Sequence, residues 1–167
     1  MNVSATVKST IATALLGIVT VGLAPSSASA ATATTTFAVS ATVQATCTVT
    51  ATAMAFGTYV STAASASTST VSVTCTNSTP YSVGLDAGAT TGATVTTRQM
   101  KNGAALLNYA LFSDTARTIN WGNSTGSWVS GTGAGTAQAL TVYGQVAAGQ
   151  FVTPGAYADT ITATVTY

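Results

Sequence analysis

Two stretches near the ends of the chain alternate strictly between apolar and polar residues. The apolar residues of the first stretch, just ahead of Cys47, are Phe37, Val39, Ala41 and Val43. The apolar residues of the second stretch, within 159–167, are Ile161, Ala163, Val165 and Tyr167. Period-two alternation is typical of a half-buried β-strand. The pattern therefore predicts one strand near each end of the chain.

The second stretch runs to the last residue of the sequence, so no later segment can pair with it. A strand missing beside it would have to come from elsewhere, and the first stretch of a neighbouring molecule is expected to supply it. The chain is then a subunit that polymerises. The alternatives are that the first stretch is the first strand of its own fold and that 159–167 is a plain edge strand.

Shorter alternating runs lie between these two stretches, within 47–51, 71–75, 81–85, 107–111 and 140–146. A polar stretch of Ser, Thr and Ala ends at Ser69. Further along, Asn102-Gly103 is a signal for a hairpin turn, and residues 131–135 are expected to form a flexible turn. Helical periodicity is absent after residue 30. Seven or eight short strands separated by turns predict an all-β, immunoglobulin-like sandwich.

The first 30 residues predict a signal peptide. Lys8 is their only charge, 11–23 is an apolar run, and Ala28-Ser29-Ala30 is the small-x-small pattern of a cleavage site. A retained membrane anchor is the alternative, but the run is shorter than the roughly 20 residues that span a bilayer core. Cleavage would leave residues 31–167, enough for one domain.

Charge is scarce: Lys and Arg number 4, Asp and Glu number 3, and His is absent. After cleavage the net charge is zero, from Arg98, Lys101 and Arg117 against Asp86, Asp114 and Asp159. Near-zero charge favours self-association. Without a basic patch to displace counterions from phosphate, nucleic-acid binding is not expected.

The two cysteines, Cys47 and Cys75, are most simply one disulfide in an exported chain. Two free buried thiols are the alternative. The loop that this bond closes is long enough for a stabilisation of about 3–4 kcal/mol in the chain-entropy model.

No pattern in the sequence predicts an enzyme. Gly122-Asn123-Ser124-Thr125-Gly126 fits the G-x-S-x-G pattern, but the chain has no His to act as the base. Three scattered aspartates predict no metal site, and no cofactor or small-molecule substrate is expected. A sugar-binding platform is an alternative function, but core or interface packing is favoured for its candidate aromatics, Trp121, Trp128 and Tyr143.

Several landmarks together resemble the spore coat protein U family, which includes subunits of archaic chaperone–usher pili. They are the alternating segment before Cys47, Phe56-Gly57-Thr58-Tyr59, 71–77, 81–88, Leu107-Asn108-Tyr109, Trp121-Gly122, Val142-Tyr143-Gly144 and Gly155-Ala156-Tyr157-Ala158-Asp159-Thr160. The resemblance covers nearly all of residues 33–167. The cysteine context and the Gly-x-Tyr-x-Asp-Thr ending make it fairly specific.

This resemblance implies an incomplete immunoglobulin-like sandwich that a donor strand from a neighbouring subunit completes. Residues 31–46 would be the donor segment and 47–167 the pilin body. The edge of the acceptor groove would then be formed by Ile161, Ala163, Val165 and Tyr167. A periplasmic chaperone would cover this groove until an outer-membrane usher exchanges the chaperone for the donor segment of the next subunit.

The function expected from the resemblance is a structural rod subunit of a cell-surface pilus that supports adhesion and biofilm formation. The chain would pass through the periplasm and form a head-to-tail polymer of identical subunits. The alternatives are a spore-coat or other surface-coat protein, a monomeric carbohydrate-binding adhesive module and, more remotely, a hydrolase.

Overall fold

The computed structural model describes residues 29–167, which contain eight β-strands and no helix. The predicted signal peptide lies outside the described residues except for its last two. Residues 41–167 form one compact unit, to which residues 29–40 do not belong. Residues 29–46 carry no strand. Between residues 29 and 167, no helix has the length and apolarity needed to cross a bilayer.

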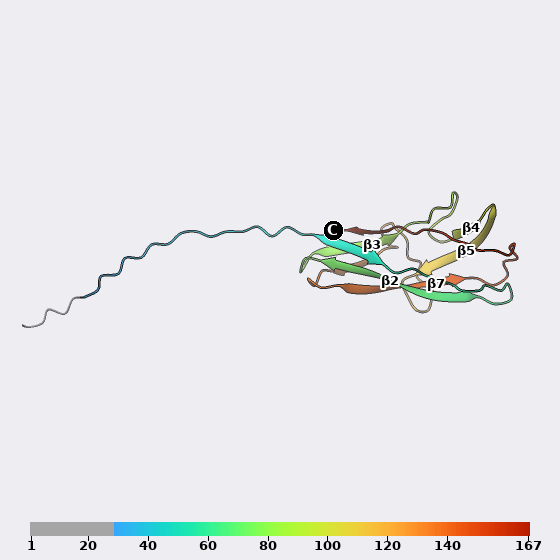
Figure 1. The fold of residues 1–167 in the computed structure, drawn as a ribbon, viewed down its shortest axis with the longest axis horizontal. Coiled ribbons are helices and arrows are strands. Elements are labelled where there is room, and N and C mark those ends of the chain that lie inside the picture. The colour runs from blue at the N-terminus through green and yellow to red at the C-terminus, as the bar shows by residue number, and fades with distance from the viewer. Residues whose placement is uncertain (1–28) are drawn as a thin grey trace, which may run out of the picture. The chain divides into compact units, whose positions relative to one another are not determined.

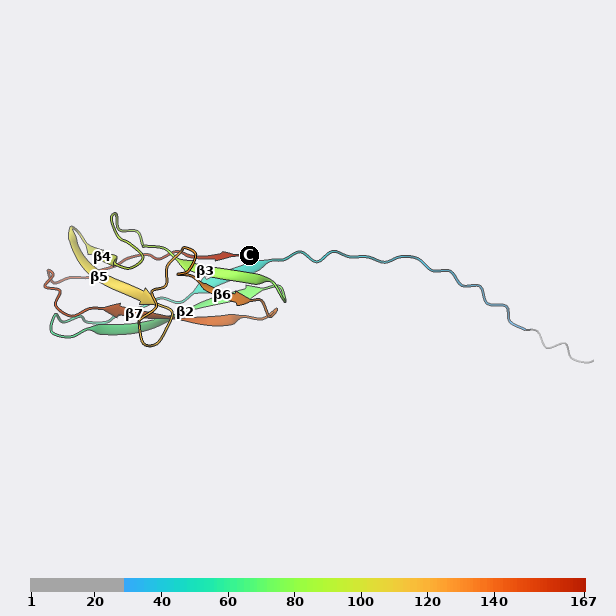
Figure 2. The same ribbon diagram turned by 180° about the vertical axis from the view of Figure 1, so that it is seen from behind.

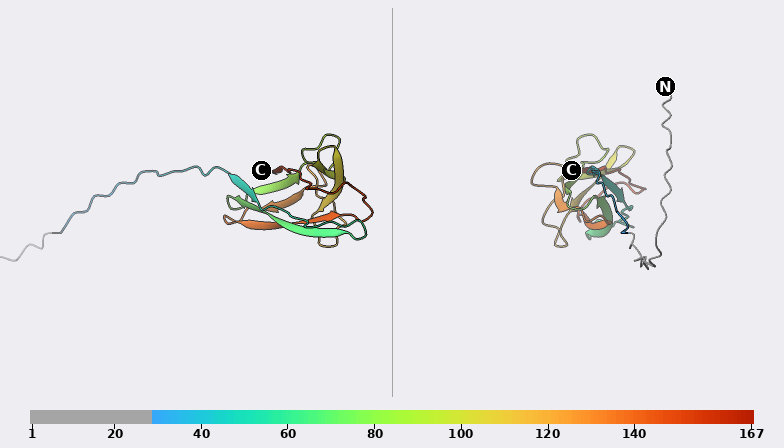
Figure 3. Two further views of the ribbon diagram at one scale, coloured as in Figure 1. Left: turned by 45° about the vertical axis from the view of Figure 1, so that its right-hand side comes forward. Right: turned by 90° about the vertical axis from the view of Figure 1, so that its left-hand side faces the viewer.

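The strands of the compact unit form two antiparallel sheets (Figures 1 and 2). The larger sheet has the order β1 (Cys47–Ala51), β2 (Ser65–Cys75), β7 (Gln138–Val146), β5 (Ala105–Phe112) and β4 (Arg98–Asn102). The smaller sheet has the order β6 (Val129–Thr132), β3 (Pro80–Leu85) and β8 (Ala163–Thr166). The two sheets lie face to face, so the all-β sandwich predicted from the alternation is confirmed (Figure 3).

The core lies between the sheets and is built from alternate residues of the longer strands. Because side chains on a strand point to opposite faces in turn, each strand gives every second residue to the interior. The buried apolar residues are Val71, Val73, Cys75, Tyr81, Val83, Leu85, Leu107, Tyr109, Leu111, Trp121, Val142 and Val146.

Two expected elements are present but begin at other residues than expected. The strand expected at 71–75 begins at Ser65, inside the polar stretch, and pairs with β7 from Ser65 to Val73. Its serines lack the apolar signal of a strand, yet their hydroxyls bond to a neighbouring segment. The flexible turn expected at 131–135 begins two residues late, since Gly131 pairs with Tyr81 as part of β6. A Cβ at Gly131 would come within 2.6 Å of the Tyr81 ring, so only glycine fits there.

The hairpin at Asn102-Gly103 is confirmed. Asn102 pairs with Ala105, so the two loop residues are Gly103 and Ala104. Gly103 has a φ of +59°, in the left-handed region that glycine adopts readily. This hairpin places Arg98 of β4 opposite Tyr109 of β5.

Candidate functional site

The candidate site lies between the edge strands β1 and β8, which are close in space but share no ladder in the compact unit. In β1, the Thr46 carbonyl accepts from Thr76 N and Thr52 N donates to Thr70 O, so even-numbered residues face β2. The backbone groups of the odd-numbered residues Cys47, Val49 and Ala51 therefore point away from the sheet.

The same alternation applies to β8. Thr162 O accepts from Asp86 N at 3.1 Å, which shows that even-numbered residues face β3. The backbone groups of Ala163 and Val165 therefore point away from β3. Two strand edges with free N–H and C=O groups thus border the same part of the molecule. Such edges are templates for pairing with a further strand.

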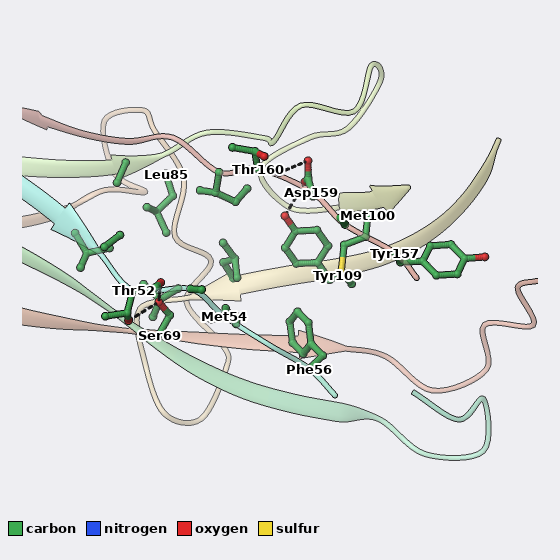
Figure 4. A pocket seen from close by; sticks show the side chains of 18 residues that line it. Thr52, Met54, Phe56, Ser69, Leu85, Met100, Tyr109, Tyr157, Asp159 and Thr160 are labelled. Carbon is green, nitrogen blue, oxygen red and sulfur yellow. Dashed lines mark hydrogen bonds between the residues drawn. The ribbon is translucent and has the colours of Figure 1, made fainter. Parts of the chain in front are cut away.

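A cavity of about 420 Å³ opens between the chain that follows β1 and the chain that precedes β8 (Figure 4). Residues 51–56 form one wall and 157–163 form the other. The floor comes from both sheets and is mostly apolar; its residues include Val71, Leu85, Met100, Tyr109, Leu111 and Val142. Phe56 and Tyr109 meet across this cavity in an edge-to-face contact, with ring centres 6.0 Å apart.

A second cavity, of about 880 Å³, continues from the first. Its walls are 54–59 and 150–157, and the residues that line both cavities are Met54, Phe56, Met100 and Tyr157. The two cavities therefore form one groove that is open to solvent on one side. We call this the groove below.

Serines of β2 hold the first wall of the groove in place. Ser67 Oγ donates to Ala55 O at 2.7 Å and Ser65 Oγ donates to Phe56 O at 2.9 Å. Ser69 Oγ bonds in the same way to Thr52 O. These hydroxyls satisfy carbonyl groups that have left the β1–β2 ladder, which is why the polar half of β2 forms a strand.

The second wall is held by carboxylates. Asp159 Oδ2 accepts from the Tyr109 hydroxyl at 2.7 Å, and its Oδ1 accepts from Ala89 N and Thr160 N (Figure 4). Asp86 Oδ1 accepts from Thr162 N at 3.0 Å. Burial, and secondarily the hydrogen bond to Asp159, raises the pKa of Tyr109 well above its ordinary value.

Arg98 lies behind this wall and is fully buried. Its guanidinium donates to the carbonyl oxygens of Asp86, Val95, Leu85 and Trp121 at 2.6–3.0 Å. Burial lowers the pKa of Arg98, and the nearby Tyr109, Asp86 and Asp159 partly oppose this shift. Three of the bonds join β4 to the end of β3 and to the segment before β6, and the bond to Val95 O holds the loop before β4.

Of the four residues expected at the acceptor edge, two line the groove. Ile161, Ala163 and Val165 are half-buried against the core, and Ile161 and Ala163 line the first cavity. The ordered strand is shorter than the stretch 159–167, because β8 covers only Ala163–Thr166. Tyr167 lies beyond it and is 58% exposed.

The residues expected in the donor strand are exposed in the described chain. Phe37, Val39 and Val43 are 82–85% exposed, and Ala41 is also exposed. They belong to no strand. Exposed apolar side chains on alternate positions are the pattern that a pairing strand presents before it is buried.

The two cysteines form the predicted disulfide. Cys47 and Cys75 are paired across β1 and β2, with their Cα atoms 4.1 Å apart. The bond fixes the first residue of β1, and therefore the strand edge that borders the groove.

The other sequence motifs lie apart from the groove. Trp121 is 1% exposed, so it is not part of a sugar-binding platform on the surface. Its Nε1 donates a hydrogen bond to Val83 O. Ser124, in the G-x-S-x-G pattern, lies in a turn beside the Ser127 hydroxyl. Among residues 29–167, no group of three His, Cys, Asp or Glu could hold a metal ion.

Sequence reasoning missed the roles of Arg98, Tyr109 and Asp159. Asp159 and Arg98 were counted toward the net charge, and neither was given a role in the site. The Asn-Gly signal predicts the hairpin but not this pair, because Arg98 and Tyr109 are equally spaced only from the observed loop residues, Gly103 and Ala104. What no local pattern gives is that Asp159, 50 residues later, meets the Tyr109 hydroxyl.

Comparisons with known proteins agree on one family. A family model described as Spore Coat Protein U domain matches residues 33–164. The chain is 41% identical over 86 residues to Protein U of Myxococcus xanthus, covering 50% of this chain and 48% of that protein. This chain thus spans about half the length of that relative.

A solved structure with the same fold is a chain in the crystal structure of the CsuC–CsuE chaperone–tip adhesion subunit pre-assembly complex. It comes from archaic chaperone–usher Csu pili of Acinetobacter baumannii. The TM-score is 0.57 at 26% identity, covering 75% of this chain and 40% of that chain.

Proposed function

The chain belongs to the Spore Coat Protein U domain family, and we propose that it is a structural subunit that polymerises by strand donation into a cell-surface pilus. In this proposal, residues 31–46 of one molecule enter the groove of the next. The observation that carries it is the groove between residues 51–59 and 150–163, at whose end the unpaired edges of β1 and β8 lie close together. The sandwich is, on this reading, one strand short.

The groove suits an extended segment better than a small molecule. It runs between two chain segments, 51–59 and 150–163, and its floor is mostly apolar. At its end, β1 and β8 each have an edge without a ladder partner. In strand addition of this kind, main-chain hydrogen bonds supply affinity and alternate side chains fill pockets. Phe37, Val39, Ala41 and Val43 have the required spacing, and burying a Phe or Val side chain contributes about 1.5–3 kcal/mol.

The contact joins different surfaces of two identical molecules, so it propagates as an open filament rather than closing as a dimer. An empty groove with free strand edges is an aggregation hazard. We therefore propose that a periplasmic chaperone covers it and that an outer-membrane usher exchanges the chaperone for the next subunit. The similarity to a chain in a chaperone–subunit complex supports the first of these partners.

Within a pilus, the chain would be a rod subunit that supports adhesion and biofilm formation. The export signal expected in residues 1–30 is consistent with passage through the periplasm to the cell surface. This role requires no catalytic group and no cofactor.

Deleting residues 31–43 tests the proposal. The truncated chain should be exported and should form its disulfide, but electron microscopy of material sheared from producing cells should show no filaments. Filaments of normal length from the truncated chain would overturn the donor role. The full chain expressed at the same level is the control.

A surface-coat protein is a second candidate, which the family description and the identity to Protein U favour. Neighbouring genes distinguish the two, because a pilus subunit requires a chaperone and an usher. Their absence from the genome would favour the coat.

A further inference from the structure

We infer that Tyr109 and Asp159 form a latch that holds residues 158–162 in place while the groove is empty. The latch keeps the groove open to a strand from another molecule. The inference rests on the proposed function for what the groove receives, but the latch itself is argued from contacts within residues 41–167.

The wall formed by 158–162 has few ladder bonds of its own. Ala158 exchanges two main-chain hydrogen bonds with Lys101 of β4, and pairing with the chain after β3 resumes at Thr162. Within the described part of the chain, no main-chain hydrogen bond joins 159–161 to another segment. On the groove side, the edge of the wall has no partner strand.

The Asp159 side chain occupies this gap in the ladder. One carboxylate accepts three hydrogen bonds, from Ala89 N, Thr160 N and the Tyr109 hydroxyl, at 2.7–2.9 Å. Hydrogen bonds to a charged group are stronger than neutral ones. The carboxylate thereby joins the wall to the loop after β3 and to the centre of β5.

Tyr109 is a rigid partner for this carboxylate. Its ring is buried in the groove floor, packed against Phe56, and its strand partner is the fully buried Arg98. Gly88 allows the carboxylate to approach, because a Cβ at this position would lie 2.1 Å from Asp159 Oδ2. The latch is therefore set among closely packed residues.

Filling the groove would make the latch redundant. Residues 159–161 have no main-chain partner in another segment, so an inserted strand would find unpaired backbone groups there. The wall would then be held by a ladder on each side. The latch thus acts in the empty state, as a positioning pair rather than as a general stabiliser.

Hydrogen–deuterium exchange of the full chain tests this inference. The variants are Tyr109→Phe and Asp159→Ala, and the matched control is Tyr157→Phe, which removes the hydroxyl of another tyrosine that lines the groove. The Tyr157 hydroxyl bonds to Thr153 O, which lies outside residues 158–162. Exchange is followed at Thr162, whose amide bonds to Asp86, and at Val142 in the core, both in the unassembled chain and in filaments.

We expect exchange at Thr162 to rise about tenfold or more in both latch variants of the unassembled chain. Exchange at Val142 and in the Tyr157→Phe control should not change. In filaments the difference at Thr162 should disappear. If Asp159→Ala does not fold, the exchange of Tyr109→Phe alone decides whether the latch exists.

Unchanged exchange at Thr162, an equal rise at Val142, or a rise that persists in filaments would each overturn the latch. If the unaltered chain forms no filaments, the proposed function fails instead. The comparison within the unassembled chain then still decides whether the latch exists.

Discussion

Cys47 lies directly opposite Cys75 in the β1–β2 ladder, and their disulfide fixes the beginning of the strand that borders the groove. β1 is only five residues long and has a partner on one side alone. A short edge strand of this kind frays easily unless it is tied down. The disulfide therefore serves the groove edge as well as the stability of the fold.

Replacing both cysteines by serine should lower the free energy of unfolding by about 3–4 kcal/mol, because the bond closes a loop of 28 residues in sequence. Urea denaturation measures this loss. Amide exchange should rise most in β1. An even rise over all strands would contradict the special dependence of β1, and chemical reduction of the unaltered chain should reproduce the result.

Substitutions at two neighbouring positions test which face of the donor segment enters the groove. Val39→Asp places a charge on the face that is expected to enter the apolar groove, so filament formation should be lost. Ser40→Asp adds the same charge on the opposite face, so filaments should still form. Electron microscopy and the sedimentation of assembled material report both results. Assembly of Val39→Asp at the normal rate, or equal loss in both variants, would contradict the expected face.

A larger side chain inside the groove should affect assembly without affecting folding. Ala163 lines the first cavity, so the larger side chain of Ala163→Leu should fit into the empty groove without destabilising the unassembled chain. The same side chain should obstruct an incoming strand and abolish filaments. Ala139→Leu, on the exposed outer face of β7, is the matched control and should assemble normally. Normal assembly of Ala163→Leu would contradict the position of the groove.

Alternation made much of this fold predictable from the sequence. Buried residues such as Val83, Leu111 and Val142 recur at every second position, so their strands were found with nearly correct bounds. The alternation fails for residues 65–69, where serines take the interior positions. Their partners are carbonyl groups of residues 52–56, a contact that exists only after the chain has folded.

The groove was predictable in outline, because Ile161 and Ala163 stood out as one apolar face. Its polar wall was not. Asp159, Tyr109 and Arg98 belong to three separate segments. The sequence around each of them suggests no special role. Their joint role depends on the packing of β4 and β5 against the last segment, which a single sequence does not specify.

Tyr109 gives the chain a pH dependence that can be measured directly. Burial and the bond to Asp159 raise the pKa of its phenol in the folded state above the ordinary value of about 10. Above that pH the unfolded chain loses this proton while the folded chain keeps it. The folded state then holds more protons, so its stability must fall as pH rises.

This contribution should therefore be fully present below about pH 10 and decline above it. Tyr109→Phe has no phenol to ionise, so its free energy of unfolding should fall less steeply than that of the unaltered chain between about pH 9 and 11. Urea denaturation at each pH measures the two slopes, and ultraviolet titration counts the phenols that ionise before unfolding. Because all other titrating groups are shared, the difference in slope belongs to Tyr109. Equal slopes would mean that its hydroxyl is not held in the wall of the groove.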